Sequence, residues 1–313
     1  MIHSLIASGS SSHKIKEGNA ADLYKSKIII AIDIGHSKNK PGATSSKGIS
    51  EYYFNFNIGK LLLNKLLAEG YTNAFIVNYQ GDDISLKDRV NVANNKKADL
   101  FISIHHDSVQ PKYLISWRHN KKQKFYCDLF SGYSIFYSNK NIVANKSLMF
   151  AKILGSKLTR NKLTPSLHHA EKLNGESRDL VNKPLGIYRV DDFGVIKSTK
   201  MPAVIFECGI IVNRNEELLL SNHAYKAIIA TSIINSINVF FRNYGHTRNS
   251  LQHSLSQCLP LPLTTPQTAS TSANHSQTAT VYHQSCTSAA PCGQRPYQRR
   301  SLTTLRGLCR SCA

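Results

Sequence analysis

The sequence predicts an α/β fold in a single domain, with a mostly parallel, twisted sheet of about six strands flanked by helices. Three continuous apolar runs, at residues 27–35, 71–79 and 98–104, are typical of strands that are buried on both faces. Two stretches with apolar residues at helical spacing, residues 51–69 and 85–97, lie between them. Strand, helix, strand in this order requires crossover connections and therefore parallel pairing.

The first predicted helix has recognisable ends. Ser50 is expected to cap its N-terminus, and Gly70 is expected to stop it. Apolar spacing and helix-end signals predict further elements. A short helix is expected around residues 20–25, before the first strand. The later elements are expected to be strands at 132–138, 186–190 and 202–210 and helices at 141–159 and 223–242.

Composition divides the 313 residues into three parts. Residues 1–26 are a polar lead-in segment, and residues 27–245 form the catalytic domain. Residues 246–313 contain six Arg but no Lys, Asp or Glu, and few large apolar side chains. Such a segment cannot offset its ordering entropy, so we expect a disordered, low-complexity tail. Its isolated pair Cys309 and Cys312 is a weak metal signal.

The net charge of +20 favours polyanionic partners, among them nucleic acid, anionic lipid and anionic wall polymers. The sequence has no nucleic-acid-binding motif and its basic residues are scattered, so we expect no specific nucleic acid. No apolar run approaches the roughly 20 residues of a membrane span, so we expect no transmembrane segment. We also expect the chain to be a monomer. Cys127 and Cys208 could form a disulfide or remain buried thiols.

Polar residues capable of chemistry lie at or near the carboxyl ends of three of the predicted strands. His36 follows the first strand, His105 follows the third, and Glu207 lies near the end of the strand at 202–210. Because the carboxyl ends of parallel strands meet at one rim of the sheet, these side chains are expected to converge. Glu51 joins them from the first turn of the helix that starts at the same rim.

Two His and one Glu around one point suit a catalytic zinc, which leaves a coordination position open for water. A single His at a strand end is more often structural, and a Glu at a helix start often stabilises the helix dipole. Four such residues on one rim favour the metal site. Glu207 lies in an otherwise apolar run, AVIFECGII, where an ionised carboxylate requires a nearby cation.

Three segments resemble the signature motifs of the zinc-dependent N-acetylmuramoyl-L-alanine amidase family, the catalytic domain of cell-wall amidases. They are IDIGHSKNKPGATSSKGISE, SLKDRVNVANNKKADLFISIHHDS and KMPAVIFECGIIVN. The resemblance implies a hydrolase that cleaves the amide between N-acetylmuramic acid and L-alanine in peptidoglycan. It implies one Zn²⁺ per chain, held by His36, Glu51 and His105, a zinc-bound water as nucleophile, and Glu207 as the catalytic proton carrier.

The resemblance leaves several points open. His106 stands where the family usually has a small residue, and is expected to be a neighbour of the site or a further ligand. Arg89 matches a family position and is expected to have a structural or orienting role. The insert at residues 109–130 has two possible interpretations. It is either a basic, aromatic substrate-binding flap that could act as a lid, or a loop without fixed structure.

The substrate implies the periplasm or the cell exterior, but the N-terminus has no clear signal peptide, so a cytoplasmic protein is not excluded. The alternative function is a catalytically weak or inactive cell-wall-binding protein whose basic body binds peptidoglycan and other anionic wall polymers. The presence of Glu207 argues against this alternative.

Overall fold

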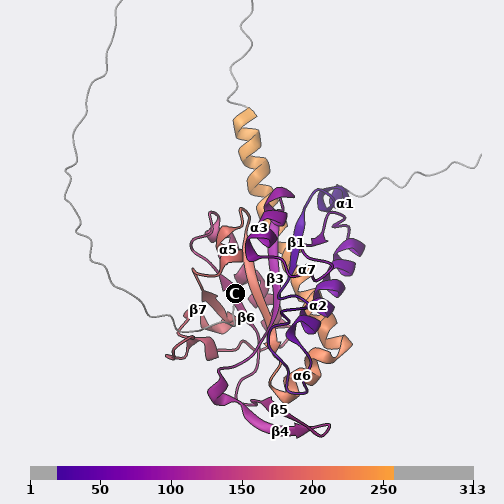
Figure 1. Ribbon diagram of the computed structural model, residues 1–313. Coiled ribbons are helices and arrows are strands. Elements are labelled where there is room, and N and C mark those ends of the chain that lie inside the picture. The colour runs from indigo at the N-terminus through magenta and orange to yellow at the C-terminus, as the bar shows by residue number, and fades with distance from the viewer. Residues whose placement is uncertain (1–19, 257–313) are drawn as a thin grey trace, which may run out of the picture. The chain divides into compact units, whose positions relative to one another are not determined.

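A seven-stranded sheet forms the centre of the computed structural model, which describes residues 20–256 (Figure 1). The strand order is β2-β1-β3-β9-β6-β8-β7. The strands are β1 (Ile30–Ile34), β2 (Phe75–Ile76), β3 (Leu100–Asp107), β6 (Ser134–Tyr137), β7 (Asp179–Asn182), β8 (Ile187–Arg189) and β9 (Ala203–Ile210). The predicted α/β class is confirmed, with β7 as an edge strand that the sequence pattern did not reveal.

Pairing within the sheet is mostly parallel, as predicted. Strand β1 pairs in parallel with β2 and β3, β3 pairs in parallel with β9, and β6 does so with β8. Only the β6–β9 and β7–β8 pairs of this sheet are antiparallel. Strands β1, β3 and β9 therefore present their carboxyl ends at one rim, where the site residues were expected.

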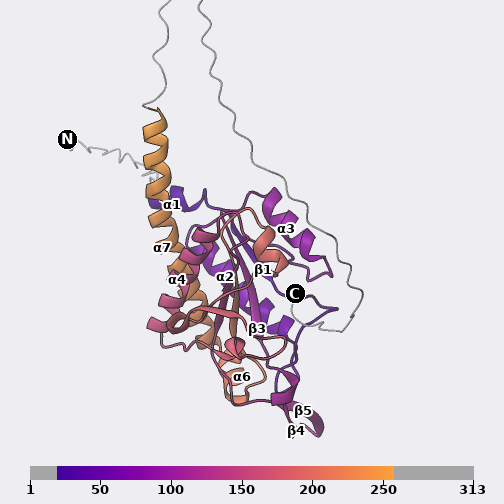
Figure 2. The same cartoon turned by 90° about the vertical axis from the view of Figure 1, so that its left-hand side faces the viewer.

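Helices cover both faces of the sheet, because its central strands are apolar on both. On one face Ile30, Ile32 and Ile34 pack with α2 (Glu51–Ala68), α4 (Ala144–Arg160) and α7 (His223–Ser256). On the other face, Ala31 packs with α3 (Leu86–Asn95) and α5 (Gly194–Ser198). Figure 2 shows α4 and α7 on one side of the sheet and α3 on the other. The remaining helices are α1 (Ala20–Lys25) and α6 (Arg214–Ser221).

Two local predictions were wrong. The strand predicted at residues 71–79 shrinks to the two residues of β2, because β2 lies at the edge of the sheet and pairs only with β1. Ser50 occupies the N-cap position of α2, but its side chain makes no capping hydrogen bond. Ser85 at the start of α3 does cap, accepting a hydrogen bond from the Asp88 amide.

The insert has regular structure, which excludes the alternative of a loop without fixed structure. A 3-10 turn (Pro111–Tyr113) precedes the antiparallel hairpin formed by β4 (Ile115–His119) and β5 (Lys122–Tyr126). Asn120 and Lys121 connect the strands with φ values of 49° and 62°. Two consecutive residues with positive φ produce the tight turn whose twist matches that of paired strands.

Helix α7 extends to Ser256 and so crosses the predicted domain boundary at residue 245. Its segment His223–Asn243 is long and apolar enough, by length and composition, to cross a membrane. Half of this segment is buried inside the fold, where Ile229, Ile233 and Ile237 pack under the sheet. The high hydropathy of α7 is thus explained by the core that it covers. The predicted tail beyond Ser256 lies outside the described residues.

Cys127 and Cys208, the two cysteines within residues 27–245, are free and buried. Cys208 lies in β9 within the main core, and Cys127 lies in a small cluster with Val109, Ile210 and Val212. The open choice between a disulfide and buried thiols is therefore resolved in favour of the thiols.

Candidate metal centre

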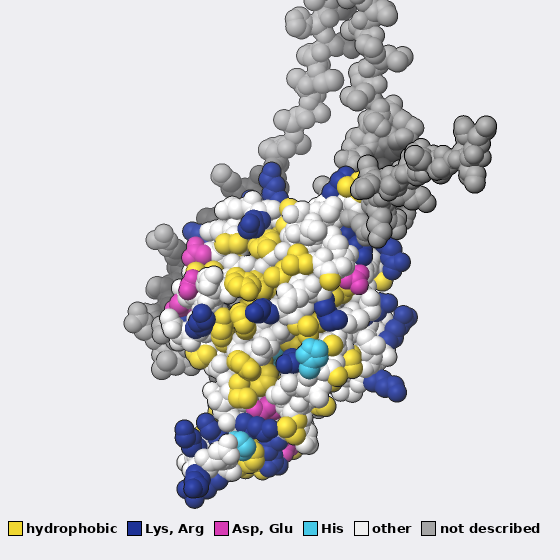
Figure 3. All heavy atoms as spheres, turned by 90° about the vertical axis from the view of Figure 1, so that its right-hand side faces the viewer, with side chains coloured by type: hydrophobic (Ala, Val, Ile, Leu, Met, Phe, Trp, Pro, Cys, Tyr) yellow, Lys and Arg dark blue, Asp and Glu magenta, His cyan; other side chains and the backbone are white. Residues whose placement is uncertain are grey.

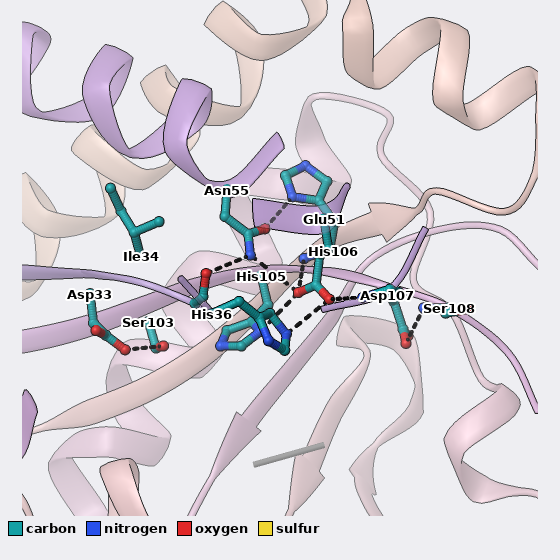
Figure 4. A network of polar contacts seen from close by, with 12 residues as sticks. Asp33, Ile34, His36, Glu51, Asn55, Ser103, His105, His106, Asp107 and Ser108 are labelled. Carbon is teal, nitrogen blue, oxygen red and sulfur yellow. Dashed lines mark hydrogen bonds and ion pairs between the residues drawn. The ribbon is translucent and has the colours of Figure 1, made fainter. Parts of the chain in front are cut away.

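His36, Glu51 and His105 meet at the predicted rim of the sheet (Figure 4). His36 comes two residues after β1, Glu51 is the first residue of α2, and His105 lies in β3. Their ligand atoms all lie within 4.8 Å of one another. Three segments of the chain that are distant in sequence thus supply one donor atom each to one point.

The Glu51 carboxylate lies between the two imidazoles. Its Oε2 is 2.9 Å from His36 Nε2, and its Oε1 is 3.0 Å from His105 Nδ1. The carboxylate side chain is only 5% exposed, whereas the imidazoles retain 23% and 20% exposure. The centre is therefore closed on the side of Glu51 and open to solvent on the side of the two rings, where a substrate can approach.

Close contacts keep Glu51 ionised although it is buried. Burial alone would raise the pKa of Glu51, but hydrogen bonds and charge interactions with His105 and His36 lower it well below its ordinary value. Asn55, one turn later in α2, donates to Glu51 Oε1 at 3.1 Å, and the Ala43 amide donates to Oε2 at 3.1 Å. The carboxylate is thus held as an anion in a fixed orientation.

Two glycines leave the space that the three side chains occupy. A Cβ atom on Gly35 would overlap the His105 ring. A Cβ atom on Gly42 would overlap both Glu51 Oε2 and the His36 ring, and Gly42 also has a φ of 75°. Only glycine adopts this φ without strain. The glycines of the segment IDIGHSKNKPG therefore allow the centre to form.

A buried ion pair fixes the turn that carries His36. The Arg89 guanidinium contacts the Asp33 carboxylate at 2.8 Å and donates to the carbonyl oxygens of Ile34, at 2.6 Å, and of His36. Ser103 Oγ donates to the other oxygen of Asp33 at 2.7 Å. His36 itself has a φ of 69°, which a non-glycine residue adopts only where its surroundings hold it. The orienting role expected for Arg89 agrees with these contacts.

Glu207 lies directly beside His105, because the two are register partners in the parallel pair β3–β9. Register partners in neighbouring strands point to the same face of a sheet. Burial, together with the negative charges of Asp107 and Glu51, raises the pKa of Glu207 well above its ordinary value. Within residues 20–256, its Oε2 has no hydrogen-bond partner. A carboxyl group that readily holds a proton therefore occupies the register position next to His105.

The match to the N-acetylmuramoyl-L-alanine amidase family covers residues 30–239. The chain belongs to this family. A putative N-acetylmuramoyl-L-alanine amidase of Buchnera aphidicola subsp. Acyrthosiphon pisum is 28% identical over 244 residues, which cover 69% of this chain and 95% of that protein. The N-acetylmuramoyl-L-alanine amidase LytC of Bacillus subtilis is 29% identical over 218 residues, which cover 68% of this chain and 35% of LytC.

Solved structures of the family share the fold. The catalytic domain of CwlV from Bacillus (Paenibacillus) polymyxa var. colistinus has a TM-score of 0.51 at 24% identity, covering 69% of this chain and 98% of that domain. The N-acetylmuramoyl-L-alanine amidase from Clostridium difficile 630 has a TM-score of 0.53 at 23% identity, with 69% and 97% covered. These likenesses agree with the resemblance found in the three sequence motifs.

His106, the residue that departs from the family pattern, lies outside the group of three donors. It is 1% exposed, its Nδ1 is 2.7 Å from Asn55 Oδ1, and its ring packs on Phe54. Figure 4 shows the ring reaching Asn55 on the side away from His36 and His105. Burial lowers the pKa of His106 to about 3, so its imidazole is neutral and orients Asn55.

Sequence reasoning missed the group that supports the loop before Glu51. Glu217 in α6 is fully buried and accepts hydrogen bonds from Ser45 Oγ at 2.7 Å, from Ser46 Oγ and from the Lys47 amide at 3.1 Å. These contacts fix the loop whose last residue precedes α2. The helix α6 was not predicted, and a Glu in the first turn of a helix carries no sequence signal that distinguishes it from an ordinary dipole-stabilising acid.

We predict that Gly42→Ala disrupts the centre, because the added methyl group overlaps both Glu51 and His36 and the backbone is strained. The metal dissociation constant, measured by competition with a chromophoric chelator, is expected to rise at least about tenfold, a loss of roughly 1.4 kcal/mol. Gly70→Ala is the matched control, because Gly70 also has a positive φ (92°) but lies at the opposite end of α2. Equal metal affinity in the two variants would contradict the packing described here.

Proposed function

We propose that this chain is a zinc-dependent hydrolase that cleaves the amide between N-acetylmuramic acid and L-alanine in peptidoglycan. In this proposal His36, Glu51 and His105 hold one zinc ion and Glu207 carries the proton. The observation that carries the proposal is the convergence of these three donor atoms within 4.8 Å, beside Glu207, in a member of this family.

The donor set fits zinc. Two imidazole nitrogens and one carboxylate oxygen are the ligands of many catalytic zinc sites, and three protein ligands leave a position open for water or substrate. The partial exposure of both imidazoles matches this requirement. When bound, zinc would polarise the amide carbonyl and lower the pKa of a bound water to about 7.

The remaining chemistry belongs to Glu207. Hydrolysis of an amide requires a base that takes a proton from the attacking water and an acid that delivers a proton to the departing amine nitrogen of L-alanine. A carboxyl group with a raised pKa can perform both steps in turn, because it accepts the proton readily and releases it to the more basic amine. The position of Glu207 next to His105 supports this role.

The position and the exposed side chains of the hairpin β4–β5 support a role for it in wall binding. Trp117 Nε1 donates to the Ser46 carbonyl at 3.0 Å, so the hairpin contacts the loop that leads to Glu51. Arg118 and Lys122 are exposed on it, and Phe125 is 50% exposed. Figure 3 shows Lys and Arg side chains gathered at the lower end of the molecule, where the hairpin lies. We infer that this basic, aromatic flap binds anionic wall polymers beside the scissile bond.

The substrate implies where the protein acts. Peptidoglycan is assembled outside the cytoplasmic membrane, so we propose that this chain acts as a monomer in the periplasm or at the cell exterior. The net charge of +20 supports retention on an anionic wall.

We predict that Glu207→Gln abolishes turnover of purified peptidoglycan, because the amide cannot carry the proton. The rate of release of new L-alanine amino termini is expected to fall by at least about 10²-fold. Zinc content is expected to stay unchanged, because Glu207 is not one of the proposed ligands. Glu69→Gln, at the exposed C-terminal end of α2, is the matched control. A parent protein that binds the wall but releases no amino termini would support the wall-binding alternative instead.

We predict that Arg118→Glu with Lys122→Glu weakens binding to peptidoglycan carrying anionic polymers by roughly tenfold at low salt. Co-sedimentation with walls before and after chemical removal of those polymers measures the effect. The exposed pair Lys152→Glu with Lys200→Glu, placed on other elements, makes the same change in net charge. The same loss in both double variants would indicate that total charge, rather than the hairpin, determines binding.

A further inference from the structure

A second group of ligand atoms lies outside the proposed zinc centre. Asp107 ends β3, and His168 and His169 begin the 3-10 turn His168–Ala170. Asp107 Oδ2 is 2.7 Å from His169 Nε2 and 3.3 Å from His168 Nε2. All three ligand atoms lie within 4.8 Å of one another. The family motifs found in the sequence give no role to either histidine.

His168 provides a separate sign that a ligand belongs here. It is 3% exposed, and its Nε2 has no hydrogen-bond partner in the described part of the chain, although it lies 3.3 Å from Asp107 Oδ2. A buried polar atom without a partner is costly and rare in folded proteins. A cation between this nitrogen and the carboxylate would satisfy both groups.

The other nitrogen of each imidazole is already engaged. His168 Nδ1 is 2.8 Å from Ser166 Oγ, and His169 Nδ1 is 2.8 Å from Glu176 Oε2. Gln110 in turn donates to Glu176 Oε1 at 3.0 Å. Metal-binding histidines characteristically use one nitrogen for the ion and the other for a hydroxyl, carbonyl or carboxylate that orients the ring. Both histidines of this group have that arrangement.

The spacing also suits an ion. Two ligands about 2.0 Å from a tetrahedral zinc lie about 3.3 Å apart, which is the observed separation between Asp107 Oδ2 and His168 Nε2. His169 Nε2, now at hydrogen-bonding distance from Asp107, would move outward by a few tenths of an ångström. It would release its proton to solvent as the ion binds.

We propose that Asp107, His168 and His169 form a second binding site for a divalent transition metal ion, with zinc as the ion that this mixture of nitrogen and oxygen donors favours. The ion joins the end of β3 to the loop before β7, two segments about sixty residues apart in sequence. The rings of Phe130 and Phe136 lie 5.5 Å from His168 and 5.0 Å from His169, respectively. The two rings keep the group out of bulk water, and an ion bound there would fix this loop against the end of β3.

Zinc content measured by mass spectrometry tests the proposal on four full-length proteins that have been dialysed against the same zinc buffer. They are the parent, His168→Gln, His36→Gln and the variant with both substitutions. We expect each single variant to lose one zinc per chain and the double variant to lose two. Zinc bound elsewhere on the chain is common to all four proteins and cancels in the differences. His223→Gln, at an exposed position, is the control and is expected to match the parent.

This experiment tests the second site and the proposed zinc centre independently of each other. Parental zinc content in His168→Gln would overturn the second site and leave a hydrogen-bonded His–Asp–His group. Parental zinc content in His36→Gln would instead contradict the centre described under the proposed function.

A second variant keeps the test valid if His168→Gln does not fold. Ser166→Ala leaves all three donors in place but removes the partner that orients His168. Loss of such a partner typically weakens metal binding by about 10–100-fold. Titration with a chelator is expected to show that loss for one of the two zinc ions, and parental affinity for both would contradict the proposal.

Discussion

The placement of one buried carboxylate, that of Glu51, between two imidazoles is the constraint on which the rest of the site depends. An ionised carboxylate taken out of water costs several kcal/mol unless partners surround it. His36 and His105 each contact a different oxygen of Glu51, and Asn55 and the Ala43 amide occupy further positions on it. The first turn of α2 adds a favourable dipole. Contacts with the protein alone therefore fix the orientation of the carboxylate.

Meeting that constraint involves several distant parts of the chain. The left-handed backbone of His36 is held by the Arg89–Asp33 pair, and Gly42 gives the space that Glu51 requires. Glu217 holds the loop that leads into α2 from the opposite side. Strands β1, β3 and β9 lie in parallel register, so that His105 and Glu207 are neighbours. Arg89, Asp33 and Glu217 are all buried, and only the folded chain brings them to the segments that they hold.

The sequence was sufficient to predict the fold class and the convergence of His36, Glu51 and His105. The predictions of the fold class, His36 and His105 rest on periodicity and on the rule that parallel strands share a rim. The prediction of Glu51 rests on a helix start and on the family resemblance, and none of these predictions requires knowledge of side-chain packing. The extent of β2 and the hairpin β4–β5 could not be predicted in this way. The first depends on edge pairing, and the second depends on a turn of Asn120 and Lys121, which lacks the usual glycine.

The group formed by Asp107, His168 and His169 shows the same limit more clearly. Asp107 was visible at a strand end, but the two histidines lie in a polar segment without periodicity. Only the packing of that segment against the end of β3 brings them together. Pattern reasoning thus finds residues that regular elements position, and misses residues that irregular loops position.

The most direct test of the account is an anomalous difference map, recorded at the zinc absorption edge from crystals grown with zinc. The account predicts a peak about 2.0–2.2 Å from a nitrogen of His36, a nitrogen of His105 and an oxygen of Glu51. The absence of a peak at this point, or a peak whose ligands do not include Glu51, would contradict it.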